Sequence, residues 1–506
     1  MLIPIIGLEV HVQLKTKSKL FCSCVAHEAA TPNTNVCPVC LAHPGTLPVP
    51  NQEAVRMAVT LGLALGCRIN SPSRFDRKHY FYPDLPKGYQ ISQYEHPVAE
   101  GGLVILEVPG GERPNINVGI TRAHLEEDAG KSFHLDDGTT LVDFNRAGIP
   151  LVETVTEADL RSPAEAKAFL QELRLIVRTL GISDGDMEKG HLRCDANISL
   201  REYDDAGEIV GLTWNPKTEI KNLNSFRHVE RALLFEINRQ TECWKAGATP
   251  SVTTTRRWND AKQQTEEMRT KEGAADYRYF PEPDIPPLVL APLAEELKTM
   301  IPELPAAKRR RFVDEYQLKP ADAKLLIEDP GLADFAEHAF SELAEWQGSL
   351  PEFAALDETE KKKGLGKLTK LCVGYLTSKL TGLLAERGSD IRIAHLTPEN
   401  FAELITLVAT NKLNSRTAVE VLGHMLETGA DPSHIMEDRQ LGQIQNTDML
   451  AAAINRVIAG NPKEAAAYKA GKTALLQFFV GKVMKETEGT ADPKMTQNLL
   501  VVTLEK

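Results

Sequence analysis

The sequence predicts an α+β fold, in which an N-terminal domain built on a mainly antiparallel sheet is followed by all-helical domains. Up to about residue 290 the chain reads as strands, Gly and Pro turns and a few helices, and beyond it every segment reads as helix. A proline-dense segment, residues 279–287, marks the change. Because 506 residues are too many for one core, we predict three domains, residues 1–290, 291–393 and 394–506.

The first predicted strand, residues 7–13, puts Glu9, His11 and Gln13 on one face and apolar residues on the other. Three further segments alternate in the same way. The polar face of the first carries Arg193, Asp195, Asn197, Ser199 and Arg201, and that of the second carries Lys217, Glu219 and Lys221. The third carries Arg122, His124, Glu126 and Asp128, provided that the strand through residues 116–120 extends that far. Histidine, carboxylates and cations on one side of a sheet are typical of a cleft for a metal ion and anionic groups. The alternative is an ordinary solvated face, which would favour Thr, Lys and Ser over the oxygen ligands that Mg²⁺ needs.

Four of the eight cysteines form a compact motif over residues 22–40. Cys22 and Cys24 make a C-x-C pair, Cys37 and Cys40 make a C-x2-C pair, and twelve residues separate the pairs. Two tight turns at this spacing can offer four thiolates to one tetrahedral Zn²⁺, and four sulfur ligands would leave the site closed and structural. The alternatives are a redox pair and a knuckle that has lost its metal. The motif predicts a structural zinc knuckle.

Two apparent phosphate-binding loops fail on inspection. Gly130-Lys131-Ser132 and Gly471-Lys472-Thr473 end like a P-loop, but Leu125 and Ala466 stand where its first glycine is required. The basic and aromatic segment 74–89 is a better candidate, because its cations can neutralise phosphoryl oxygens and its rings can stack on a base. The alternative is an aromatic-rich structural loop. If the chain uses ATP, it does so without a P-loop.

Several helices carry clear terminal signals. Ser162-Pro163-Ala164-Glu165 reads as a capping box with proline at the first helical position, and Gly181 reads as the stop of that helix. Thr397-Pro398, Asn461-Pro462 and Asp492-Pro493 each read as a capping residue followed by proline. We predict helices at residues 398–409, 415–428, 448–460, 472–488 and 493–504.

Composition restricts the classes of partner. No apolar run reaches the roughly 18 residues of a membrane span and the first residues do not read as a signal peptide, so we expect a cytoplasmic protein without a membrane partner. The formal net charge of -12 argues against nonspecific electrostatic binding of nucleic acid, and we expect no DNA partner. Two local basic clusters, residues 308–311 and residues 361–363 with Lys367 and Lys370, are solvated faces or contacts to RNA.

Long motifs distributed from one end of the chain to the other resemble the B subunits of bacterial aspartyl/glutamyl-tRNA(Asn/Gln) amidotransferases. They are GLEVH (7–11), NVCPVC (35–40), FDRKHYFYPDLPKGYQ (75–90), HLEEDAGK (124–131), DFNRAGIPL (143–151), RCDANIS (193–199), EIKNLNSF (219–226) and FFVGKVMK (478–485). The resemblance implies that residues 1–290 form a cradle domain for phosphorylation and transamidation. In that reaction ATP phosphorylates the side-chain carboxylate of Glu on tRNA(Gln) or Asp on tRNA(Asn), and ammonia then displaces phosphate.

The resemblance also implies roles for individual residues. His11, Glu126 and Glu153 are expected to hold Mg²⁺. The wider catalytic set is Glu9, His11, Glu126, Glu127, Glu153 and Asp195, and the candidates for ATP contacts are Lys78, Lys87, Glu219 and Lys221. The residues of the tail, 394–506, are expected to bind tRNA.

The source of ammonia is expected to be another polypeptide. The chain has neither a Gly/Ser-rich amidase signature nor an N-terminal cysteine nucleophile. The resemblance implies a heterotrimer with a glutaminase A subunit and a small C subunit, and hence an ATP-dependent carbon–nitrogen ligase with glutamine as amido donor. Two alternatives stay open. The first is a non-catalytic zinc scaffold that binds RNA, which would not explain the acidic cleft. The second is a self-sufficient ligase that acts on a free amino acid, which would not explain the helical tail.

Overall fold

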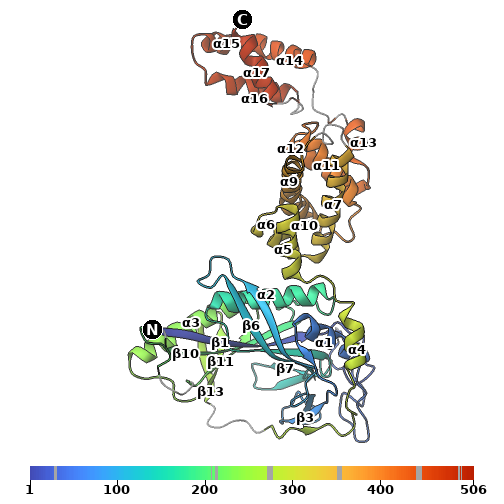
Figure 1. Ribbon diagram of the computed structural model, residues 1–506, viewed down its shortest axis with the longest axis vertical. Helices are drawn as coiled ribbons and strands as arrows, with labels where there is room; N and C mark the ends of the chain where they lie inside the picture. Colours follow the sequence, from blue (N-terminus) through green and yellow to red (C-terminus); the bar gives the residue numbers. More distant parts are fainter. Residues whose placement is uncertain are drawn as a thin grey trace. The chain divides into compact units, whose positions relative to one another are not determined.

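The computed structural model describes residues 1–27, 31–206, 208–210, 215–270, 277–349, 356–439, 441, 447–487, 491 and 493–505. The chain forms two compact units, Met1–Ala306 and Ala307–Lys506. The first unit contains the sheets, and the second is helical (Figure 1). The predicted α+β class is therefore confirmed, while the residue ranges of the three domains stay predictions.

The first unit is built on a nine-stranded sheet with the order β13-β12-β11-β10-β1-β9-β6-β5-β2. Every neighbouring pair is antiparallel except β11 and β12, which run parallel. The strands are β1 (Leu2–Gln13), β2 (Arg68–Ile69), β5 (Ala99–Glu107), β6 (Asn115–Glu127), β9 (Pro150–Thr156), β10 (Leu192–Glu202), β11 (Thr218–Leu223), β12 (Thr254–Asn259) and β13 (Gln264–Thr270). Smaller sheets are formed by β14 (Phe280–Pro281), β3 (Asp76–His79) and β4 (Tyr89–Ser92), and by β7 (Lys131–His134) with β8 (Thr140–Asp143).

Alternation along the strands decides which face of the large sheet is covered. Leu8, Val10 and Val12 on β1 are at most 1% exposed and share one core with α1 (Gln52–Ala64), α2 (Pro163–Thr179), α3 (Phe226–Lys245) and α4 (Ala291–Lys298). Since successive side chains point to opposite faces, Glu9 and His11 lie on the face away from this core. The helices therefore leave the polar face free to form the site described below.

The predicted signals of α2 are confirmed, with one difference. Ser162 accepts a hydrogen bond from the Glu165 N–H, Pro163 is the first helical residue, and Gly181 has φ +68° just beyond the end. The Glu165 carboxylate accepts from the Arg161 N–H and pairs with the guanidinium of Arg113. The second half of the predicted capping box is therefore replaced by an ion pair.

The second unit consists of helices in two apolar cores. Its helices are α5 (Pro305–Tyr316), α6 (Pro320–Ile327), α7 (Pro330–Ser349), α9 (Glu358–Gly374), the π-helical turn η1 (Tyr375–Leu380), α10 (Thr381–Glu386), α11 (Pro398–Ala409), α12 (Ser415–Thr428), α13 (Pro432–Asp438), α14 (Thr447–Gly460), α15 (Pro462–Lys469), α16 (Leu475–Glu486) and α17 (Pro493–Glu505). One core runs from Phe312 to Ile435 and the other from Leu450 to Leu504. The rings of Phe335 and Phe401 pack edge to face at 5.6 Å, so the predicted boundary at residues 393 and 394 lies inside the first of these cores.

The predicted helices of this region agree closely with the structure. The ranges 398–409 and 415–428 coincide with α11 and α12, and the other three differ by a few residues. Thr397 caps α11 as predicted, but Asn461 donates its side-chain N–H to the Val457 carbonyl and does not cap α15. Asp492 lies outside the described residues. Among the described helices, none is both long and apolar enough to cross a membrane.

Candidate active site

Strand register brings one row of polar side chains together on the free face of the sheet. His11 on β1 is paired with Glu153 on β9 and, on its other side, with Arg193 on β10. Glu153 is paired in turn with His124 on β6. Paired residues in antiparallel strands have Cβ atoms about 4.5–5.5 Å apart, and Glu126 follows two residues along β6 on the same face. Three strands, β1, β9 and β6, therefore supply one compact cluster, and Arg193 on β10 lies beside it.

The cluster contains two buried carboxylates and two histidines. Glu126 and Glu153 are 3% and 8% exposed, and the His11 Nε2 atom lies 3.2 Å from Glu126 Oε1 and 3.4 Å from Glu153 Oε2. The His124 Nε2 atom lies 3.4 Å from the same oxygen of Glu153 and 3.7 Å from Glu126 Oε2. Ser92 donates its hydroxyl to Glu126 at 3.3 Å. Two adjacent carboxylates in a low dielectric need a nearby cation.

The pKa values show how the cluster is neutralised. Burial alone lowers the pKa of His11, but hydrogen bonds and charge from Glu126 and Glu153 outweigh burial and raise that pKa to about 10. Burial raises the pKa of both carboxyls, yet hydrogen bonds with His11 and His124 hold the pKa of Glu126 well below its ordinary value. The charge of His124 and the hydrogen bond with His11 lower the pKa of Glu153 to about 2. The two carboxyls are therefore ionised, and in the metal-free cluster the neighbouring histidines balance their charge.

The donor atoms fit a divalent cation. His11, Glu126 and Glu153 each present one ligand atom, and these atoms lie within 4.8 Å of one another. Two carboxylate oxygens suit a hard cation such as Mg²⁺, which keeps several waters, whereas the imidazole also suits softer divalent ions. The Nδ1 atom of His124 is buried without a hydrogen-bond partner among the described residues. His124 therefore faces the two carboxylates through Nε2 alone.

A second polar group lies further along the sheet. The Lys221 Nζ atom lies 2.6 Å from Asp195 Oδ2 and 2.9 Å from Glu219 Oε1. The Asn197 amide donates to Glu9 at 2.8 Å. Burial opposes the charge of Lys221, but the two carboxylates raise its pKa above the ordinary value. The charge of Lys221 is thus balanced by neighbouring carboxylates.

Both groups line one polar cleft of about 980 Å³. At the edge of the cleft, Asp128 pairs with two cations. The Asp128 Oδ2 atom lies 2.6 Å from the Arg193 guanidinium and 3.6 Å from Arg146 Nε. Lys78 also lines the cleft, with its ammonium 5.1 Å from the centre of the Tyr277 ring. The predicted residues found in the cleft are Glu9, His11, Lys78, Glu126, Glu153, Asp195, Glu219 and Lys221.

Two predicted site residues lie elsewhere. Glu127 follows Glu126 on β6 and therefore points to the other face, where the Lys87 Nζ atom lies 2.6 Å from its Oε1 atom. Both residues line a smaller cavity of about 170 Å³ beside Cys22 and Cys40. The structure thus brings Lys87 and Glu127 together, but it does not bring them to the cleft.

Sequence reasoning did not assign a role to His124, Asp128, Arg146 or Arg193. Alternation already placed His124, Asp128 and Arg193 on polar faces, and that pattern was the available signal. Arg146 lies in a loop without periodicity, so its place at the cleft depends on the tertiary structure.

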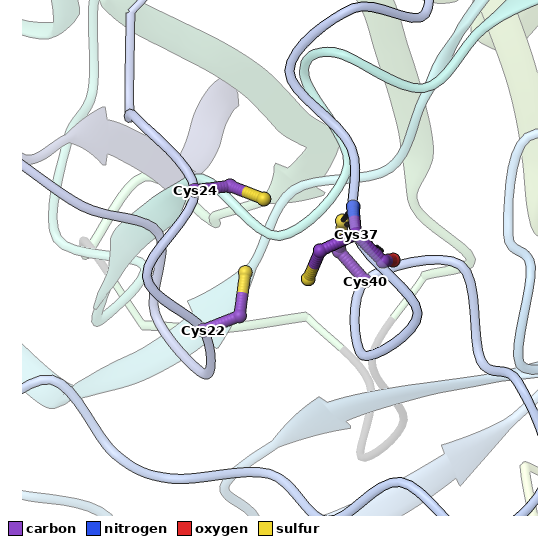
Figure 2. Close-up of side chains that lie close together, drawn as sticks. All are labelled: Cys22, Cys24, Cys37 and Cys40. Carbon is purple, nitrogen blue, oxygen red and sulfur yellow. Dashed lines mark hydrogen bonds between the residues drawn. The ribbon is translucent and has the colours of Figure 1, made fainter.

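The four clustered cysteines meet at one point (Figure 2). Their sulfur atoms lie within 4.8 Å of one another, with Cys22 and Cys24 on one segment and Cys37 and Cys40 on another. The Cys37 N–H donates to Cys40 Sγ at 3.1 Å, as expected for a turn that presents sulfur to a metal. A hydrogen bond from Cys22 lowers the pKa of Cys40 to about 4, which favours a thiolate there. The cluster can bind zinc.

Comparison with known proteins covers nearly the whole chain. Residues 4–295 match the family model of the GatB/GatE catalytic domain, and residues 357–504 match that of the GatB domain. The chain is 45% identical over 509 residues to the B subunit of the aspartyl/glutamyl-tRNA(Asn/Gln) amidotransferase of Thermotoga neapolitana, with 99% of each chain covered. The protein of the same name from Thermodesulfovibrio yellowstonii is 44% identical over 98% of each chain. That from Rippkaea orientalis is 43% identical over 98% of this chain and 96% of its own.

Proposed function

Because this chain belongs to the family of aspartyl/glutamyl-tRNA(Asn/Gln) amidotransferase B subunits, we propose that its cleft carries out the activation and amidation of a tRNA-bound amino acid. Members of this family are parts of a multi-subunit amidotransferase, a ligase-type enzyme. The substrate is Glu-tRNA(Gln), Asp-tRNA(Asn) or both, and the reaction takes place in the cytoplasm. The observation that carries the proposal is the cluster of His11, Glu126 and Glu153 in a cleft edged by cations.

The chemistry has two steps. A side-chain carboxylate oxygen of the charged tRNA attacks the γ-phosphorus of ATP, the bond from that phosphorus to the bridging oxygen breaks, and ADP leaves. The nitrogen of ammonia then attacks the carbonyl carbon of the acyl phosphate, the carbon–oxygen bond to phosphate breaks, and ammonia gives up a proton. The first step is needed because a carboxylate is a poor acceptor for an amine, whereas phosphate is a good leaving group.

The residues of the cleft have distinct tasks in this scheme. His11, Glu126 and Glu153 would hold Mg²⁺, which when bound supplies positive charge beside the phosphoryl oxygens. Arg193 and Arg146, held by Asp128, are positioned to bind anionic groups at the cleft edge. Lys78 is a further phosphate contact. Lys221 already shares its charge with two carboxylates, so we assign it to positioning Asp195 and Glu219.

The remaining components of the reaction come from outside the chain. Ammonia would be delivered by a glutaminase A subunit, and a small C subunit would complete a heterotrimer, giving a carbon–nitrogen ligase with glutamine as amido donor. For tRNA, α9 offers a groove of about 590 Å³ lined by Lys362, Lys363, Lys367 and Lys370. Their ammonium groups can neutralise the phosphates of an RNA backbone, a contact that does not depend on the base sequence. By contrast, Lys308 and Arg311 pair with Asp334 and Glu337 and serve the helix packing of that unit.

Glu126→Gln tests the proposed chemistry in the reconstituted complex. The variant keeps the shape of the side chain but removes a charge worth several kcal/mol in the transition state, so ammonium-dependent amidation of charged tRNA should fall by roughly a hundredfold or more. The assay uses ammonium chloride in place of glutamine, which makes the result independent of the partner's glutaminase.

The control is Glu112→Gln, which makes the same change at an exposed residue between β5 and β6. It should leave amidation unchanged, and both variants should bind charged tRNA and keep basal glutamine hydrolysis. Normal amidation by Glu126→Gln would move the chemistry elsewhere and favour a role as an RNA-binding scaffold.

A further inference from the structure

Lys19 is a buried lysine beside the cysteine cluster. Its relative exposure is 0%, which places it among the largest fully buried side chains of the described residues. Removing an ammonium from water costs several kcal/mol unless an opposite charge or a set of hydrogen-bond acceptors replaces the water. The contacts of Lys19 therefore indicate why a charge is retained at this position.

The ammonium of Lys19 contacts two carbonyl oxygens and one sulfur. Its Nζ atom donates to the Asn35 carbonyl at 2.8 Å and to the Phe144 carbonyl at 3.4 Å, and it lies 3.8 Å from Cys40 Sγ. Among the described residues, no carboxylate lies within ion-pair distance of Nζ. The nearest group able to carry a full negative charge is thus the thiolate of Cys40.

A metal-bound cysteine cluster supplies that charge. Four thiolates and one divalent ion carry a net charge of about -2, which is itself costly to bury without a cation nearby. Groups outside the ligand set that donate to the ligands tune the affinity of such a site. One ammonium 3.8 Å from a ligand sulfur is placed to do so.

The backbone around Lys19 joins both halves of the knuckle. The Lys19 N–H donates to the Cys24 carbonyl at 2.9 Å, while its side chain reaches Asn35 and Cys40 in the second half. Gly148 closes over the lysine stem: it has φ +86°, and a Cβ there would lie 3.4 Å from Lys19 Cδ. The stem is therefore confined, and the ammonium is directed at the sulfur cluster.

We propose that Lys19 is the buried counter-ion of the cysteine cluster, a positioning residue that strengthens the binding of zinc by the four thiolates. The proposal depends on the metal chemistry of the knuckle and is independent of the function assigned to the cleft.

The test compares zinc affinity in Lys19→Met with that in Lys17→Met. Methionine removes the charge of Lys19 and keeps most of its apolar volume, and Lys17 is an exposed lysine two residues away that undergoes the same change. Affinity is measured on the full chain at about pH 7 by competition with a chromophoric zinc chelator. Lys19→Met should weaken zinc binding by roughly tenfold or more, and Lys17→Met should stay within about threefold of the wild type.

Thermal unfolding with and without zinc separates this role from simple packing. With zinc bound, Lys19→Met should melt below the wild type. In excess chelator the loss of melting temperature should be smaller, because the ammonium then faces the Cys40 thiolate alone and not a metal-bound cluster of four thiolates. Lys19→Gln, which keeps an N–H donor but no charge, should behave like Lys19→Met.

Three results would overturn the proposal. These are an unchanged zinc affinity in folded Lys19→Met, an equal loss of melting temperature with and without zinc, and a failure of both neutral variants to fold even in chelator. Each would assign Lys19 to the fold and not to the metal.

Discussion

His11 links the stability of the cleft to pH in the metal-free protein. Its pKa in the folded state is about 10, above the ordinary value of 6.5, so its stabilising contribution is complete below pH 6.5 and is lost as pH rises toward 10. The pKa of Glu153 is lowered from 4.5 to about 2, so its contribution is complete above pH 4.5 and is lost as pH falls toward 2. The metal-free cluster should therefore stabilise the fold most between pH 4.5 and 6.5.

We predict that the titration of His11 makes the free energy of unfolding depend on pH. In excess chelator, the free energy of unfolding of the wild type should fall by up to about 1.4 kcal/mol per pH unit above pH 7, because the folded state holds one proton more than the unfolded chain. His11→Gln should lack this part of the slope. Calorimetric melting of both proteins from about pH 6 to pH 9 measures the difference. Parallel curves would mean that His11 is neutral in the folded, metal-free protein.

At the scale of elements, the contact of α1 with the sheet depends on a glycine. A Cβ built on Gly62 would lie 2.5 Å from the Cβ of Ala99 on β5 and 2.9 Å from the Cδ1 of Ile69 on β2. Glycine is a poor helix former, so its presence in the last turn of α1 has a packing reason here. It lets the helix backbone approach the sheet edge closely.

Gly62→Ala should therefore destabilise the first unit despite the better helix propensity of alanine. We expect a loss of about 1–3 kcal/mol from overpacking, read as a lower unfolding midpoint in denaturant. Gly382→Ala on α10 is the matched control, since among the described residues no atom beyond its chain neighbours and its own helix backbone lies within 4 Å of the added Cβ. That change should raise stability by about 0.5–1 kcal/mol. Stabilisation by Gly62→Ala would show that α1 can shift without loss of packing.

At the scale of the whole molecule, the described helices of the second unit pack into two separate apolar cores. The helices of 447–505 bury their apolar faces in a core of their own, which includes Phe479, Val483 and Leu500. The core from Phe312 to Ile435 includes residues on both sides of position 394. A truncation there would expose Phe335 and its neighbours, so a test of the tail has to cut after Leu441.

Removing residues 442–506 should weaken tRNA binding without changing the chemistry. In the complex with its partner subunits, we expect the KM for charged tRNA to rise by at least about tenfold, while kcat with ammonium at saturating tRNA stays close to that of the full chain. Basal glutamine hydrolysis without tRNA is the control. An unchanged KM would assign tRNA binding to other surfaces, such as the lysine groove on α9.

The sequence by itself determined the features that depend on near neighbours in the chain. Alternation with period two placed Glu9, His11, Glu126 and Asp195 on polar faces, and capping residues with proline located α2 and α11. Short spacing likewise indicated the cysteine knuckle. These signals are local, because side-chain direction and helix termination depend on residues two to four positions apart.

Only the tertiary structure decided which polar faces meet. The order β10-β1-β9-β6 sets His124 against Glu153, and the fold brings Lys87 to Glu127 in the cavity beside the knuckle. Strand order and register are long-range properties, and they depend on how the whole apolar face packs against its helices. For the same reason a single lysine, Lys19, carries no periodic signal in the sequence, and its burial beside four cysteines is set by segments more than 100 residues apart.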